Sequence, residues 1–123
     1  MQVNADPPEA PIERRRQPRL NFTEPIQFRD LLKAESLFYG SLARDLSAGG
    51  LKIRHYTPMA KGDRLLLLLD LPDPQRRVRA IAQVSWQSRR PFGSGYETGL
   101  QFIGISPEDR DSIAGFVERG VVS

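Results

Sequence analysis

The sequence predicts an all-β domain, a sandwich or a barrel of about six antiparallel strands, followed by one helix. From Ile26 onward, short apolar runs are separated by turn residues, a spacing that is typical of all-β folds. The chain has 123 residues, 39% of them hydrophobic and 27% charged, with ten glycines and ten prolines. This length suits one domain, and this composition suits a globular chain with many turns. The short connections favour antiparallel pairing.

Three segments have the clearest strand patterns. In residues 78–86, five side chains alternate onto one expected face: Val78, Ala80, Ala82, Val84 and Trp86. Residues 63–71 form a leucine-rich run closed by two prolines, which favours a strand over a buried helix. Residues 96–105 alternate again after a glycine-rich turn and should pair with residues 78–86 as a hairpin. Weaker strand candidates are residues 25–31, 37–44 and 50–56.

One helix is predicted at the carboxy end of the chain. Ser106 can cap it, Pro107 suits its first position, and Asp109 completes a Ser-x-x-Asp capping box. Gly120 is the expected end of the helix. Three apolar residues recur at helical spacing and should pack against the strands: Ile113, Phe116 and Val117.

The composition excludes several classes of function. The chain has no cysteine and a single histidine, His55, so disulfides and ordinary zinc or iron centres are not expected. No cofactor or metal is expected, and no nucleophile, base and orienting group can be assembled, so we predict that the protein is not an enzyme. No apolar run approaches the roughly 20 residues of a membrane span, and the first residues do not resemble a signal peptide. We therefore expect a cytoplasmic protein.

Basic residues are concentrated near the amino end. The net charge is only +3, but four arginines lie close together: Arg14, Arg15, Arg16 and Arg19. Five of the ten prolines fall within the first 25 residues, so this stretch is predicted to be an extended arm. A guanidinium group is a planar fork that fits phosphate oxygens and the O6 and N7 atoms of guanine. Taken alone, the cluster also fits a solvated basic tail or a nonspecific patch for nucleic acid or anionic lipid.

Residues 45–50, Asp-Leu-Ser-Ala-Gly-Gly, join two of the predicted strands. Asp and Ser side chains bond nearby backbone N–H groups and glycines accept positive φ, so one interpretation is a plain hairpin connection. A second interpretation is functional. An ionised Asp45 can accept both the N1–H and the exocyclic amine of a guanine, and Ser47 adds a short donor or acceptor beside it. The residues alone leave both interpretations open.

Together, Arg-x-x-x-Arg at residues 15–19 and Asp-x-Ser-x-x-Gly at residues 45–50 resemble the PilZ domain family of cyclic di-GMP receptors. The similarity extends to residues 13–16, 50–53, 84–86 and 96–102. It covers residues 13–119, with residues 1–12 as a flexible arm and residues 120–123 as a tail. The resemblance implies a six-stranded antiparallel barrel with a carboxy-terminal helix, which binds this bacterial second messenger and catalyses no reaction.

The resemblance also assigns roles to the residues of the two motifs. Arg15 and Arg19 are expected to grip the phosphates and the Hoogsteen edge of guanine. Asp45 and Ser47 should contact guanine from the barrel side, and Gly50 should permit close approach of the backbone.

Three further residues are assigned to the ligand site on the same resemblance. Arg14 lies where family members with a basic residue tend to hold two intercalated ligand molecules, so two cyclic di-GMP molecules per chain are expected. Arg16 adds a further contact. Trp86 resembles an aromatic residue found beside the ligand in some relatives, although an aromatic residue on an alternating apolar face is more often part of the core.

The leading interpretation is a second-messenger receptor that orders its arginine arm on binding and signals to an unidentified downstream protein. Two alternatives remain open at this point: a small barrel that binds nucleic acid through the same arginines, and a PilZ-like adaptor that binds no ligand. Steep salt dependence across many oligonucleotides would distinguish the nucleic-acid function.

Overall fold

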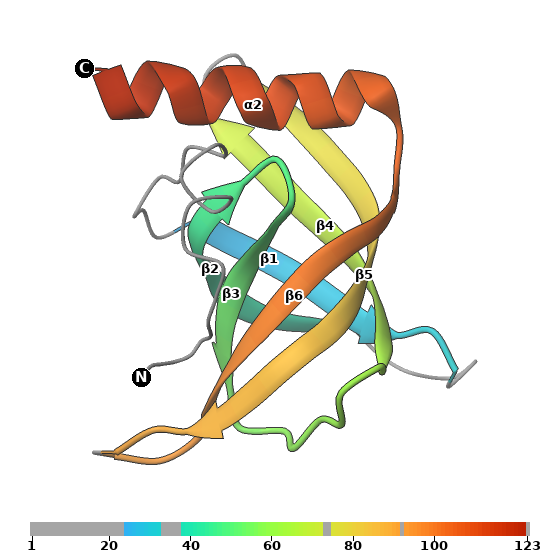
Figure 1. Ribbon diagram of the computed structural model, residues 1–123, viewed down its shortest axis with the longest axis vertical. Helices are drawn as coiled ribbons and strands as arrows, with labels where there is room; N and C mark the ends of the chain where they lie inside the picture. The colour runs from blue at the N-terminus through green and yellow to red at the C-terminus, as the bar shows by residue number, and fades with distance from the viewer. Residues whose placement is uncertain (1–23, 33–37, 73–74, 92, 123) are drawn as a thin grey trace.

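In the computed structural model, the described residues form a closed barrel of six antiparallel strands with helix α2 across an end (Figure 1). The structure describes residues 24–32, 38–72, 75–91 and 93–122. The strands and the helix are β1 (Glu24–Asp30), β2 (Tyr39–Ser47), β3 (Gly50–His55), β4 (Arg64–Pro72), β5 (Gln75–Arg89), β6 (Tyr96–Ile105) and α2 (Pro107–Val122). The predicted all-β fold, the number of strands and the hairpin between β5 and β6 are confirmed.

The barrel closes through pairings between strands that are distant in the sequence. The order around the barrel is β1, β2, β3, β6, β5 and β4, and β4 pairs with β1 to complete the ring. In this arrangement the leucine run of β4 lies between β1 and β5. Alternate leucines from Leu65 to Leu71 face the barrel interior and are almost fully buried. On the outer face Leu66 is also buried and Leu68 is partly buried, so most of the run is shielded from water.

Helix α2 packs its predicted stripe against the barrel. Ile113 and Val117 are buried, and Phe116 packs against the same core. The hydroxyl oxygen of Ser106 accepts a hydrogen bond from the backbone N–H of Asp109 at 3.0 Å, as expected of an N-cap.

Two predictions about the helix are wrong. The carboxylate of Asp109 does not complete a capping box but turns to β5, where it accepts a hydrogen bond from Arg76 at 2.8 Å. This ion pair joins α2 to β5 and adds to the apolar packing between the helix and the barrel. The helix also continues past Gly120 to Val122, because a glycine lowers helix stability without forcing an end.

The strand predictions fail in two informative places. β2 does not end at Arg44 but continues to Ser47, and its pairing with β3 shifts register between these two residues. β5 does not end at Trp86 but continues to Arg89, with a register shift between Val84 and Trp86. Each shift inserts an extra residue, which turns the following side chains relative to the sheet.

His55 ends β3 within an aromatic cluster at the end of the barrel opposite α2. Its ring meets Phe28 edge-on, with 4.8 Å between ring centroids, and meets Tyr39 at 5.5 Å. Its Nδ1 atom accepts a hydrogen bond from the backbone N–H of Thr57 at 3.1 Å, so this nitrogen carries no proton. Partial burial lowers the pKa of His55 below its usual value.

The lowered pKa of His55 predicts a loss of stability in mild acid. The unfolded chain binds a proton at His55 near pH 6.5, whereas the folded chain does so only at lower pH. The free energy of unfolding should therefore fall as the pH drops from 7.5 to 5.5, since folding then excludes a proton. Urea unfolding at both pH values measures the effect. His55 is the only histidine, so His55→Gln should remove this part of the pH dependence; an equal fall in the variant would contradict the assignment.

Candidate ligand-binding site

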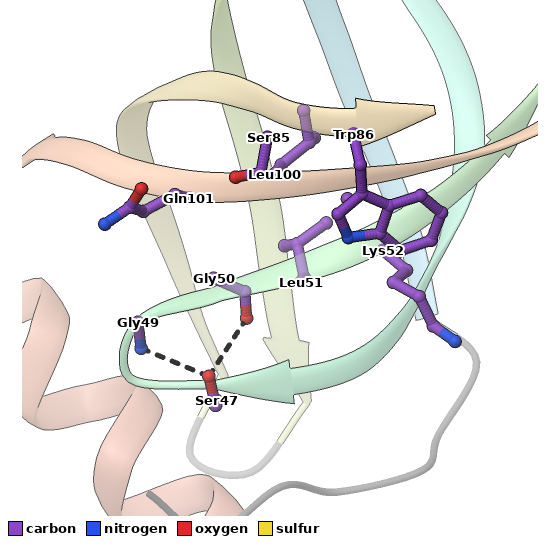
Figure 2. A pocket seen from close by; sticks show the side chains of 10 residues that line it. Ser47, Gly49, Gly50, Leu51, Lys52, Ser85, Trp86, Leu100 and Gln101 are labelled. Atoms are coloured by element: carbon purple, nitrogen blue, oxygen red, sulfur yellow. Dashed lines mark hydrogen bonds between the residues drawn. The ribbon is translucent and has the colours of Figure 1, made fainter. Parts of the chain in front are cut away.

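A shallow open pocket of about 310 Å³ lies on the outer surface of the barrel, where the β2–β3 turn meets β6 and β5 (Figure 2). Its lining is mostly polar or glycine: Ser47, Gly49, Gly50, Leu51, Lys52, Ser85, Trp86, Gly99, Leu100 and Gln101. Three residues of the Asp-x-Ser-x-x-Gly segment therefore line the pocket: Ser47, Gly49 and Gly50. The pocket brings this segment next to a tryptophan that is 36 residues away from Gly50 in the sequence.

Ser47 holds the β2–β3 turn in shape. The side chain is buried, and its Oγ atom accepts a hydrogen bond from the N–H of Gly49 at 3.2 Å. The same hydroxyl donates to the carbonyl of Gly50 at 3.4 Å (Figure 2). Both bonds lie within the turn, so Ser47 fixes the backbone that forms one wall of the pocket.

Asp45 occupies the irregular part of β2 and has a left-handed backbone, with φ of 50°. Asp tolerates this conformation better than most residues. The carboxylate forms an ion pair with Lys52 of β3, with 2.7 Å between Oδ2 and Nζ. The Asp45 carboxylate is thus not free in this structure, and any donor on a ligand would share it with an ammonium group.

Gly50 is required by the packing of two strands. A Cβ atom at this position would overlap the carbonyl oxygen of Leu100 on β6. The sequence predicted close approach of the backbone at Gly50, and the neighbour that the structure reveals is β6. Because the obstacle is backbone, a larger residue would force β3 and β6 apart.

Trp86 lies on the outer surface of the barrel and is 42% exposed. The alternation of β5 predicts an inward side chain, but the register shift after Val84 reverses its direction. The indole rests on Gly99 of β6, where a Cβ atom would overlap its Nε1 and Cε2 atoms. Gly99 is also the register partner of Lys52. The partly exposed indole therefore lies over Gly99, and the pocket that it lines also includes Lys52 of β3 (Figure 2).

The structure brings four of the eight predicted ligand residues to this region: Asp45, Ser47, Gly50 and Trp86. The other four, Arg14, Arg15, Arg16 and Arg19, lie outside the described residues. Sequence analysis missed Lys52, Gly99 and Gln101, which line the same pocket. Lys52 could have been identified from the sequence, because its side chain is expected to point outward from its strand two residues after Gly50.

Residues 24–32, 38–72, 75–91 and 93–122 contain no group of three or more His, Cys, Asp or Glu side chains that could hold a metal ion. Within the same ranges, no helix has the length and apolar character needed to cross a membrane.

A comparison with known protein families identifies the class to which this barrel with a helix across its end belongs. Residues 13–119 match the family model of the PilZ domain. This match covers most of the chain, and the chain belongs to the PilZ domain family. A comparison with curated protein sequences finds no match.

Solved structures with a similar fold include PilZ domains. The inhibitor of motility MotI from Bacillus subtilis matches with a TM-score of 0.76 and 19% identity, over 86% of this chain and 50% of that one. The PilZ domain of YcgR from Escherichia coli, solved with cyclic di-GMP, matches with a TM-score of 0.68 and 19% identity, over 88% of this chain and 94% of that domain.

A third similar structure is the complex of MrkH from Klebsiella pneumoniae with cyclic di-GMP. Its TM-score is 0.70 at 17% identity, over 87% of this chain and 51% of that one. The chain thus spans about half the length of MotI and MrkH. At these identities the similarity establishes the fold.

The contact between Trp86 and Gly99 predicts a fluorescence change. Trp86 is the only tryptophan, so emission excited selectively from tryptophan, and not from the three tyrosines, reports on this site alone. In Gly99→Ala the new methyl group must displace the indole, and the emission spectrum should shift. Gly40→Ala is the matched control, because a Cβ atom at that strand position meets nothing within 4 Å. Emission from Gly99→Ala that is indistinguishable from wild type would contradict this placement of the indole.

Proposed function

We propose that this PilZ protein is a cytoplasmic, non-enzymatic receptor for cyclic di-GMP. The observation that carries the proposal is the pocket in which the Asp-x-Ser-x-x-Gly segment lies beside an exposed tryptophan. The cyclic di-GMP complexes of the similarly folded YcgR domain and MrkH support it. The proposed receptor is a binding module that signals to a downstream protein.

On the barrel side, the pocket can provide both stacking and hydrogen bonding. The exposed face of Trp86 is a platform on which one guanine base can stack. The Asp45 carboxylate can accept the N1–H and the exocyclic amine of a guanine. For this, Lys52 must share or release Asp45, and its ammonium group is then available to a phosphate of the ligand.

On the other side of the ligand, the arginine segment provides the complementary donors. Arg15 and Arg19 are proposed to bind the phosphates and the Hoogsteen edge of guanine, and Arg14 and Arg16 add contacts. Four guanidinium groups exceed what one compact dianion needs, which supports two ligand molecules per chain. Ordering of this segment by the ligand would change the surface offered to the downstream protein.

The first test is the affinity of two site variants for cyclic di-GMP. Arg19→Ala and Asp45→Gly should each weaken binding by about 1.5–3 kcal/mol, the range for hydrogen bonds to charged groups, or roughly ten- to hundredfold. Glycine is chosen at position 45 because it accepts the positive φ of Asp45 without strain. Calorimetric titration measures the affinities.

The control variant is Asp70→Ala, which removes an exposed carboxylate that is ion-paired with Arg77 on the outer wall of the barrel. Its affinity should equal that of wild type. Cyclic di-AMP should bind at least about tenfold more weakly, because adenine presents an acceptor at N1 where Asp45 needs a donor. Equal affinity for both dinucleotides would favour nonspecific anion or nucleic-acid binding, and absence of binding to either would favour a ligand-blind adaptor.

The second test concerns the stoichiometry and the order of the arginine segment. Calorimetry should give a ratio near two ligand molecules per chain. Backbone NMR relaxation should show that residues 14–19 become rigid at saturation, because contacts to two phosphates and two bases offset the entropy of fixing them. A ratio of one would contradict the ligand pair, and relaxation unchanged by ligand would contradict ordering on binding.

A further inference from the structure

The end of the barrel opposite α2 collects exposed apolar side chains. Strands β1, β3 and β5 end there, and strands β2, β4 and β6 begin there (Figure 1). Among the described residues, four of the seven exposed large hydrophobic side chains belong to this end: Leu32, Phe38, Tyr39 and Tyr56. Leu32 and Tyr56 are 83% and 72% exposed. Such a concentration in one region marks an interaction surface.

Aromatic and basic side chains lie together at this end of the barrel. The guanidinium of Arg29 in β1 lies 5.8 Å from the centre of the Phe38 ring. The guanidinium of Arg89 in β5 lies 5.9 Å from the centre of the Tyr96 ring. In the β3–β4 connection, Tyr56 and Lys61 are both exposed. Two aromatic–cation contacts therefore lie at this end, together with a further exposed aromatic residue and a further exposed cation.

The acidic side chains of this end already have partners. Asp30 accepts a hydrogen bond from the N–H of Leu32 at 2.8 Å, and Asp63 accepts one from the N–H of Ala60 at 2.9 Å. Glu97 is paired with Arg54 at 3.2 Å. The described residues of the three connections and the adjoining strand ends include six basic and three acidic residues: Arg29, Arg54, Lys61, Arg64, Arg89 and Arg90 against Asp30, Asp63 and Glu97. This end is therefore positively charged.

We propose that this end of the barrel binds the surface of an anionic lipid bilayer. Aromatic and leucine side chains partition into the headgroup region, and nearby Lys and Arg side chains are attracted to anionic lipids. The exposed apolar side chains come from the β1–β2 side and the β3–β4 connection, and the basic residues come from all three strand-end regions, so this end suits an anionic bilayer surface better than a single peptide segment.

The lipid-binding end and the cyclic di-GMP pocket are distinct parts of the barrel. The pocket is lined by the β2–β3 turn, which lies at the end nearer α2, and by parts of β5 and β6. None of the residues that line the pocket belongs to the proposed lipid-binding end. Binding of lipid and binding of cyclic di-GMP can therefore be tested independently of each other.

Flotation of the full chain with vesicles tests this proposal. Vesicles of one third phosphatidylglycerol and two thirds phosphatidylcholine should bind at least about fivefold more protein than vesicles of phosphatidylcholine alone, because each basic residue near an anionic surface adds attraction. The double variant Leu32→Ser/Tyr56→Ser should lose most of this binding. Arg89→Gln should weaken it and reduce its sensitivity to salt.

The matched control is Leu42→Ser, which removes an equally apolar side chain, 48% exposed, from the wall of the barrel. All variants change exposed residues, and thermal unfolding followed by circular dichroism confirms that each is folded. Failure of the wild-type protein to bind the anionic vesicles overturns the proposal and leaves an acidic protein surface as the candidate partner. Equal binding to both kinds of vesicle, or an equal loss in Leu42→Ser, overturns it as well.

Discussion

The close approach of β3 and β6 is the constraint on which the barrel and its pocket both depend. At Gly50 a methyl group would overlap the backbone of β6, and at Gly99 it would overlap the indole of Trp86. The first glycine allows the two strands to pair between β2 and β5 in the closed ring. The second leaves the space in which the only tryptophan lies flat against the barrel. Closure of the barrel and construction of the site are therefore consequences of the same two residues.

This constraint also explains how a small barrel prepares a site without burying charge. The turn is held by Ser47 through bonds to Gly49 and Gly50, and the Asp45 carboxylate is neutralised by Lys52 on the surface. Partial exposure keeps the desolvation penalty of the ion pair small, so a ligand can exchange partners with it at modest cost. A fully buried pair in the same place would resist this exchange. The proposed receptor function thus depends on a carboxylate whose partner can be replaced.

Much of the fold could be predicted from local patterns. Alternation located β5 and β6, and Ser106 and Pro107 located the start of α2. The predictions fail where one inserted residue or a distant contact determines the direction of a side chain or the extent of a strand. The shift before Trp86 turned an expected core side chain outward, and the left-handed backbone at Asp45 let β2 continue past its predicted end. Likewise, Gly99 and Gln101 join the site only through the register pairing of β3 with β6, which no short-range pattern contains.

The central claim is that the pocket beside the Asp-x-Ser-x-x-Gly segment binds the second messenger together with the arginine segment. Titration of the isotope-labelled chain with cyclic di-GMP, followed by amide and indole chemical shifts, tests it most directly. The account predicts the largest changes at residues 45–52, at residues 99–101, at the indole N–H of Trp86 and in residues 14–19. Changes centred on the outer face of β1 and β4, or no changes at saturating ligand, would contradict it.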